Sequence, residues 1–170
     1  MNNFTKSRRV HRRWLYGLAT VSVIHAFEHI FQMFQIHSMH MSRAEAGGLL
    51  GYWYPWLMKS ELLHFSYALF MLIGLVVLYP GFAGRSRNWW ATALLIQVWH
   101  CFEHTLLLYQ ASTENYLFGG TVPTSVLQLV IPKAELHFFY TSLVLIPMGF
   151  AMMFYQYQPQ QHDNTQRDSV

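Results

Sequence analysis

Only 11% of the 170 residues are charged and 53% are hydrophobic, whereas about 25% of the residues in a soluble domain are charged. This composition excludes an ordinary water-soluble domain and predicts an all-α, polytopic membrane protein. The formal net charge of +3 indicates contacts with lipid headgroups, and nothing else in the sequence indicates nucleic acid.

Four apolar stretches have the length of about 17 to 25 residues that a helix needs to cross a bilayer. In chain order they cover about Trp14–Ile36, Leu57–Tyr79, Trp89–Tyr109 and Ala134–Tyr157. The first stretch is longer than the apolar part of a signal peptide, which has about 7 to 15 residues, so we expect it to remain as a helix. We therefore predict a transmembrane domain over 14–157, between a basic tail (1–13) and a polar tail (158–170).

The distribution of Lys and Arg predicts which side of the membrane each connection and each terminus lies on. Basic residues are concentrated in the first tail and in the connection between the second and third stretches, which contains Arg85 and Arg87. The opposite side has only Arg43, Lys59 and Lys133. Because positively charged flanks remain in the cytoplasm, we expect both termini there.

A repeat divides the transmembrane domain into two halves, about 14–80 and 89–157. The sequence IHAFEH at Ile24–His29 recurs as WHCFEH at Trp99–His104, and LHFSY at Leu63–Tyr67 recurs as LHFFY at Leu136–Tyr140. Each half crosses the membrane twice, so both halves have the same orientation and would be related by an axis along the membrane normal. The sequence predicts a four-helix bundle of two tandem hairpins.

Each His-x-x-Glu-His motif places two imidazoles and a carboxylate on one helix face, because residues three and four apart are neighbours on a helix. Glu61 and His64 have the Glu-x-x-His spacing of bundle-core di-iron proteins. Glu135 and His137 are two residues apart and would point in different directions. Glu135 is thus a ligand candidate that alternatively starts the helix or pairs with Lys133.

All these motifs fall at one depth in the outer half of the bilayer, counting about 1.5 Å per helical residue. We expect no Lys or Arg at this depth, so the four glutamates are either protonated, paired with His⁺ or bound to cations. Two divalent ions would balance four carboxylates. The predicted metal ligands are His25, Glu28, His29, Glu61, His64, His100, Glu103, His104, Glu135 and His137.

The His-x-x-Glu-His motif also occurs in inverted zinc peptidases, but its duplication argues against a peptidase. The ligand plan is similar to that of bundle-core di-iron carboxylate proteins, and the membrane setting is similar to that of histidine-rich desaturases, whose multi-box pattern is absent. These likenesses are analogies of architecture and identify no family.

The leading hypothesis is a membrane oxidoreductase with a dinuclear centre. Iron is favoured, with zinc, manganese or copper as alternatives. Tyr67 and Tyr140 would assist catalysis or electron transfer. The substrate would be an apolar or lipid-like molecule, or oxygen, and an electron donor would be required; the oligomeric state is left open.

Three other hypotheses remain at this stage. A divalent-metal transporter or metal sensor is suggested by the parallel repeat and by His37–Met41, which mixes imidazoles and thioethers just outside the first stretch. A b-type haem protein would use histidines of facing helices as axial ligands. A purely structural polar network would need no metal, because intramembrane histidines often form interhelical hydrogen bonds.

Overall fold

The computed structural model describes residues 3–156, which form six α-helices and three short 3-10 turns without any strand. The α-helices are α1 (Asn3–His37), α2 (Gly48–Trp53), α3 (Pro55–Lys59), α4 (Glu61–Leu78), α5 (Gly84–Thr113) and α6 (Lys133–Gln156). The 3-10 turns are η1 (Tyr79–Gly81), η2 (Leu117–Gly119) and η3 (Leu127–Leu129). The predicted all-α fold is confirmed.

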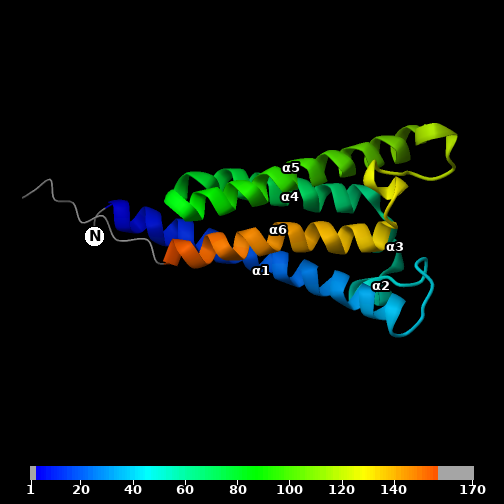
Figure 1. Cartoon of the computed structure of the whole chain (residues 1–170), viewed down its shortest axis with the longest axis horizontal. Helices are drawn as coiled ribbons and strands as arrows, with labels where there is room; N and C mark the ends of the chain where they lie inside the picture. The colour runs from blue at the N-terminus through cyan, green and yellow to red at the C-terminus, as the bar shows by residue number, and fades with distance from the viewer. Residues whose placement is uncertain (1–2, 157–170) are drawn as a thin grey trace, which may run out of the picture.

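Four long helices, α1, α4, α5 and α6, lie side by side and alternate in direction (Figure 1). Both ends of the described chain lie at the same end of the bundle as the turn between α4 and α5. The loops after α1 and α5 lie at the opposite end, which we call the loop end.

The neighbours of each long helix follow the sequence repeat. Helix α1 contacts α4 and α6, and α5 contacts the same two helices, so α1 and α5 are diagonally opposite. A half-turn about the bundle axis therefore exchanges α1 with α5 and α4 with α6. This arrangement agrees with the predicted pseudo-two-fold relation between two tandem hairpins.

Two features of the fold were not expected from the sequence. Two short helices, α2 and α3, precede α4, and α4 begins at Glu61 and not at Leu57 as predicted, because Ser60 caps it. Helix α1 begins at Asn3, so the described part of the basic tail is helical. Within it, His11 Nε2 donates to the carbonyl oxygen of Leu78 at 3.0 Å, and its ring packs edge-on against Phe82.

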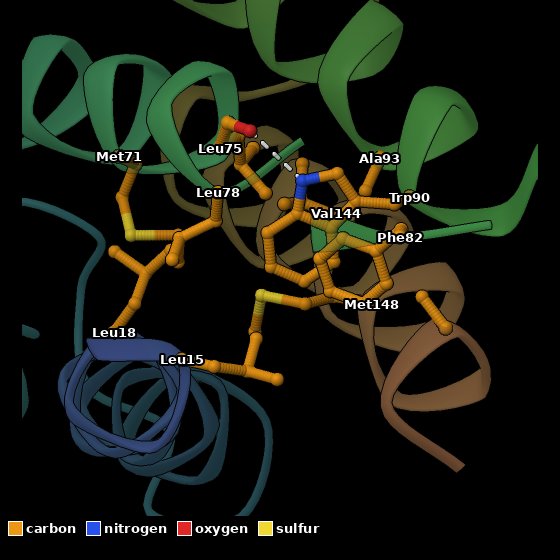
Figure 2. Packing of buried hydrophobic residues seen from close by; sticks show 11 residues of the cluster. Leu15, Leu18, Met71, Leu75, Leu78, Phe82, Trp90, Ala93, Val144 and Met148 are labelled. Atoms are coloured by element: carbon orange, nitrogen blue, oxygen red, sulfur yellow. Dashed lines mark hydrogen bonds between the residues drawn. The ribbon is translucent and has the colours of Figure 1, made fainter. Parts of the chain in front are cut away.

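An apolar cluster fills the bundle at the end opposite the loop end (Figure 2). Its centre is Trp90, which is fully buried, stacks on Phe82 with ring centres 4.2 Å apart and donates from Nε1 to the Leu75 carbonyl oxygen at 2.8 Å. Other members of the cluster are Leu15, Leu18, Met71, Leu78, Val144 and Met148. The indole N–H is satisfied, as a buried tryptophan requires, so this end of the bundle is closed and apolar.

Two helical segments of the described chain have the length and apolar composition to cross a membrane: Glu61–Gly81, which joins α4 to η1, and Lys133–Gln156, which is α6. They overlap the second and fourth predicted spans, but the segment that overlaps the second span begins at Glu61 instead of Leu57, and Tyr157 lies outside the described residues. Helices α1 and α5 are also long enough to cross a membrane. They are less apolar than α4 and α6, because they contain the histidines, glutamates and glutamines of the repeat.

Candidate metal centre

Six histidines from all four long helices gather on the loop-end side of the apolar cluster. They are His25 and His29 of α1, His64 of α4, His100 and His104 of α5, and His137 of α6. The buried His137 ring is central: its centre lies 5.1 Å from that of His104, 5.5 Å from that of His64 and 5.7 Å from that of His29. We call these six residues the histidine cluster.

The two His-x-x-Glu-His motifs have the same local geometry. The rings of His25 and His29 are 4.5 Å apart at 88°, and those of His100 and His104 are 4.6 Å apart at 83°. The spacing of four residues on a helix brings each pair together. The repeat is thus preserved in the side chains as well as in the helices.

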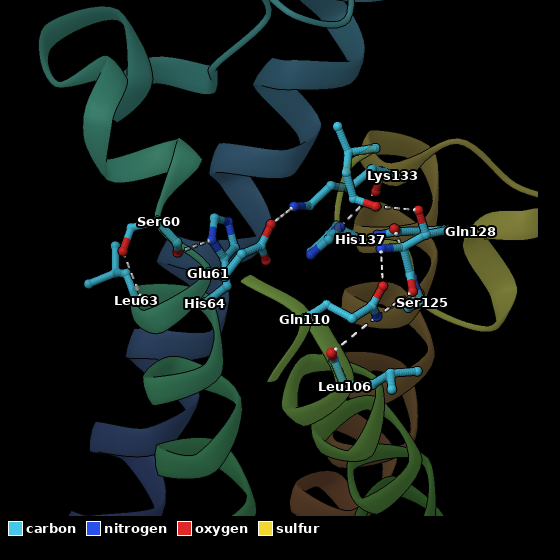
Figure 3. Close-up of polar contacts among 12 residues, drawn as sticks. Ser60, Glu61, Leu63, His64, Leu106, Gln110, Ser125, Gln128, Lys133 and His137 are labelled. Atoms are coloured by element: carbon cyan, nitrogen blue, oxygen red, sulfur yellow. Dashed lines mark hydrogen bonds and ion pairs between the residues drawn. The ribbon is translucent and has the colours of Figure 1, made fainter. Parts of the chain in front are cut away.

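Hydrogen bonds to backbone carbonyls orient His64 and His137, which occupy equivalent positions in the two halves (Figure 3). His64 Nδ1 lies 2.8 Å from the Ser60 oxygen, and His137 Nδ1 lies 2.7 Å from the Lys133 oxygen. A carbonyl only accepts, so Nδ1 carries the proton and Nε2 of the neutral ring keeps its lone pair. His137 Nε2 is buried and has no hydrogen-bond partner among the described residues.

His29 is oriented by an amide instead of a carbonyl. Gln32 Nε2 donates to the Ala46 oxygen at 2.7 Å, which leaves Gln32 Oε1 to accept from His29 Nδ1 at 3.3 Å. His29 Nε2 then accepts a hydrogen bond from His25 Nε2 at 3.0 Å. Two nitrogens that bind one metal ion at about 2.1 Å with tetrahedral or square geometry lie roughly 3.0 to 3.4 Å apart, so this pair is spaced like two ligands of one ion.

Glu28 and Glu103, the glutamates of the repeated motif, bind the loop-end backbone. Glu28 Oε2 accepts from the N–H groups of Leu49 at 2.8 Å and Leu50 at 2.9 Å, which are free donors in the first turn of α2. Glu103 Oε1 accepts from Leu127 N–H at 2.9 Å, where η3 begins. Each carboxylate therefore holds the loop that follows its own helix.

Two glutamines, Gln35 and Gln110, likewise bind loop backbone, about two helical turns further toward the loop end. Gln35 exchanges two hydrogen bonds with the backbone of Gly48, and Gln110 exchanges two with that of Thr124. Both glutamines are buried. The two glutamines occupy equivalent positions in the two halves of the repeat, but the sequence does not show what they bind, because backbone partners carry no sequence pattern.

Gly48 is required by the contact with Glu28, and a substitution tests this contact. Its φ is +75°, and a Cβ atom there would lie 2.7 Å from Glu28 Oε2. Gly119 has a similar φ of +71° but open space around it, so it is a matched control. We expect Gly119→Ala to cost about 1–2 kcal/mol for the left-handed backbone, and Gly48→Ala to cost about 0.5–2 kcal/mol more through the lost cap. Denaturant unfolding measures both; equal losses would show that the Glu28 contact contributes nothing.

The expectation that no Lys or Arg shares the depth of the glutamates is wrong. Lys133 forms an ion pair with Glu61 (Figure 3), and Arg43 binds Glu135, with Nη2 2.6 Å from Oε1. Glu135 thus pairs with Arg43 and not with Lys133. Hydrogen bonding to Glu135 raises the pKa of Arg43, so this pair stays ionised.

These ion pairs change the charge balance around the histidine cluster. Glu61 and Glu135 are neutralised by their cationic partners, whereas Glu28 and Glu103 have neutral backbone partners. The remaining charge is that of two carboxylates when the histidines are neutral. One divalent ion would balance it.

A cavity of about 20 Å³ lies between the histidine cluster and the apolar cluster. Equivalent residues of the two halves line it, among them the pairs Ser22 and Gln97, His25 and His100, and Tyr67 and Tyr140. The Tyr67 ring stacks on His25 with centres 3.8 Å apart, and the Tyr140 ring lies 4.5 Å from His100. Both tyrosines predicted from the sequence therefore contact the cluster.

The minor candidate segment His37–Met41 does not join the site. His37, Met39 and His40 are exposed at the loop end. Cys101 is buried on α5 and does not line the cavity between His25 and His100.

Within residues 3–156, no three His, Cys, Asp or Glu side chains already stand in positions that hold a metal ion. Ring-centre distances of 4.5–6.1 Å within the histidine cluster mean that side-chain rotations would have to bring the nitrogens together. Compared with known proteins, the chain matches no family model, no curated protein and no solved structure.

Proposed function

We propose that this chain is a four-span membrane protein that holds a transition-metal ion between the imidazoles of the histidine cluster and serves as an oxidoreductase. The observation that carries the proposal is the orientation of His64 and His137. Each donates from Nδ1 to a backbone carbonyl, which is the arrangement that fixes a metal-binding histidine and leaves Nε2 as the ligand atom.

The distribution of side chains supports membrane insertion of all four long helices. Buried polar residues of α1 and α5 include His29, Gln35, Gln97, Glu103, His104 and Gln110, whereas many large apolar residues of the same helices are exposed. Exposed apolar residues on these two helices include Trp14, Ile24, Phe27, Ile30, Phe34, Leu95, Val98, Trp99 and Phe102. Such extensive exposed apolar surface is typical of a membrane or partner contact and not of a water-facing surface.

Packing supports the same conclusion. Helices α4 and α6 are the apolar candidates for spans, and both α1 and α5 lie against both of them. If α4 and α6 cross the bilayer, α1 and α5 lie at the same depth, where every backbone group must be satisfied within a helix.

The charge balance favours about one divalent ion per chain in place of the two predicted from four unpaired glutamates. A ligand set of imidazoles suits iron, copper, zinc or nickel, and of these iron and copper supply redox chemistry. The two tyrosines against His25 and His100 favour a redox role. Metal analysis and an optical spectrum of one detergent-purified sample test the proposal; we expect about one ion per chain and no Soret band.

The structure supports metal transport and haem binding less well than it supports a bound redox metal. The apolar cluster below the histidines closes the bundle with Leu15, Leu75, Trp90 and Met148, which offers a metal ion no ligands on a path across the membrane. The cavities beside the cluster, of about 20 and 10 Å³, have no space for a porphyrin.

Cysteine labelling tests the topology. In a Cys101→Ala background, we expect a membrane-impermeant maleimide to label Ser38→Cys and Ser112→Cys in intact cells, because both positions are exposed at the loop end. Asn88→Cys, exposed at the other end, should react only after the membrane is disrupted. Equal labelling of all three in intact cells would contradict a four-span topology.

A further inference from the structure

We infer that the smaller cavity, beside Glu103, binds one water molecule, which accepts a hydrogen bond from His104 Nδ1 and leaves Nε2 of that ring to bind metal. Residues of α5, of α6 and of the loop between them line this cavity, so it belongs to the second half of the repeat. The binding of water does not depend on a metal ion. Its role in orienting His104 as a ligand rests on the proposed function.

The size of the cavity sets the class of ligand. Its volume is about 10 Å³, and a cavity needs about 10–15 Å³, measured in this way, to hold one water molecule. A ligand with several non-hydrogen atoms therefore does not fit.

Buried polar atoms without a partner gather around this cavity. Among the described residues, the residues that line it contribute His100 Nδ1, His104 Nδ1, Ser125 Oγ, Gln128 Nε2 and His137 Nε2. Figure 3 shows Ser125, Gln128 and His137 close to one another. Buried polar groups are normally hydrogen-bonded to protein or to ordered water, so these atoms indicate a polar ligand.

The donors and acceptors around the cavity favour water over a cation. Gln128 Oε1 accepts from the Ser125 N–H at 3.1 Å, which orients the amide and leaves Nε2 as a donor. Water can accept from Gln128 Nε2 and from His104 Nδ1 and can donate to Ser125 Oγ. Three hydrogen bonds are typical of a buried water molecule, whereas a cation cannot accept any.

A break in the repeat explains why the second half needs this molecule. Gln32 follows His29 by three residues, but the equivalent residue after His104 is Leu107. Gln32 connects His29 Nδ1 to the Ala46 oxygen of the next loop. Leu107 is buried and lines the cavity, and its side chain forms no hydrogen bond. A water molecule in the cavity replaces the missing amide and connects the ring to the loop.

This connection has a consequence for metal binding. A metal-binding histidine usually donates its other ring N–H to a carboxylate, a carbonyl oxygen or a water molecule. Protein oxygens accept from Nδ1 of His29, His64 and His137. Water in this cavity gives His104 the same orientation, with Nε2 as the ligand atom.

Water-edited NMR of the metal-free chain in lipid bilayers tests the binding of water. With isotope-labelled histidines, this experiment detects magnetisation that passes from water to nearby imidazole nitrogens, and His104→Gln assigns the His104 signals. We expect transfer to His104 Nδ1 and to the exposed His40, but not to His29 Nδ1, whose acceptor is Gln32. Transfer to His40 without transfer to His104 overturns the inference, and so does equal transfer to His29 and His104.

Two variants displace the water in different ways. Leu107→Gln supplies the amide that the first half has, so we expect the transfer to His104 to disappear and metal affinity to stay within about threefold. Ser125→Val fills the cavity with carbon and supplies no acceptor, so the transfer should disappear and metal affinity should fall by about 10- to 100-fold. Leu129→Gln is the control, because Leu129 is 56% exposed and does not line the cavity.

The outcomes separate the two proposals. Unchanged transfer to His104 in both Leu107→Gln and Ser125→Val, with helices retained by circular dichroism, overturns the water site. Lost transfer with unchanged metal affinity in Ser125→Val overturns the role of the water in orienting His104. If the unmodified chain takes up no metal, the proposed function is overturned, and NMR of the metal-free chain still decides whether water is bound.

Discussion

Replacement of His64 and His137 by alanine is expected to reduce the metal content from about one ion per chain to less than about a tenth of that value. These two rings are the only ones in the histidine cluster with Nδ1 fixed by a backbone carbonyl among the described residues, so the backbone already fixes which nitrogen of each ring is left to bind metal. Loss of such pre-oriented ligands removes most of the affinity of a metal site. Elemental analysis of the detergent-purified double variant measures the effect.

The control for this prediction removes two histidines that lie outside the cluster. His37 and His40 are exposed at the loop end, and His40→Asn suits the left-handed φ of 53° at that position. We expect His37→Ala with His40→Asn to keep the full metal content. Circular dichroism shows whether each variant keeps its helices. A folded His64→Ala, His137→Ala protein that still binds one ion would contradict the proposed site.

Removal of the charges of Glu28 and Glu103 is expected to weaken metal binding by about 10- to 100-fold, the usual effect of changing groups around a metal site. In Glu28→Gln with Glu103→Gln, the amide oxygens can still accept from Leu49 and Leu127, so the loops remain held. The bound ion would then lack the two carboxylate charges that balance it. Competition with a metal chelator measures the change in affinity.

The matched control removes an ion pair of zero net charge. Glu61→Gln with Lys133→Met deletes the pair between α4 and α6 without changing the charge near the histidine cluster. We expect metal affinity to stay within about threefold, because Glu61 acts here as the partner of Lys133 and not as a ligand. A large loss in this control and no loss in Glu28→Gln with Glu103→Gln would restore Glu61 as a ligand and overturn the charge balance proposed here.

The position of Lys133 shows why depth could not be read from the sequence. Counting residues places its Cα atom at the edge of an apolar stretch, but a long aliphatic side chain moves its ammonium group several ångströms along the bundle. Lys133 and Glu61 are 72 residues apart, and Arg43 and Glu135 are 92 residues apart. Pairs at such separations depend on which helices become neighbours, and no local pattern in either segment indicates that.

The sequence by itself determined the four long helices, the repeat and the pairing of histidines within each motif. Apolar length and the spacing of three and four residues are properties of one helix, so the grouping of His25 with His29 and of His100 with His104 follows from local geometry. Only the tertiary structure decided what the glutamates bind, because their partners are backbone N–H groups in loops or cations on other helices. It also decided the cavity beside Tyr140, since a cavity is formed by side chains of several helices and has no signature within any one of them.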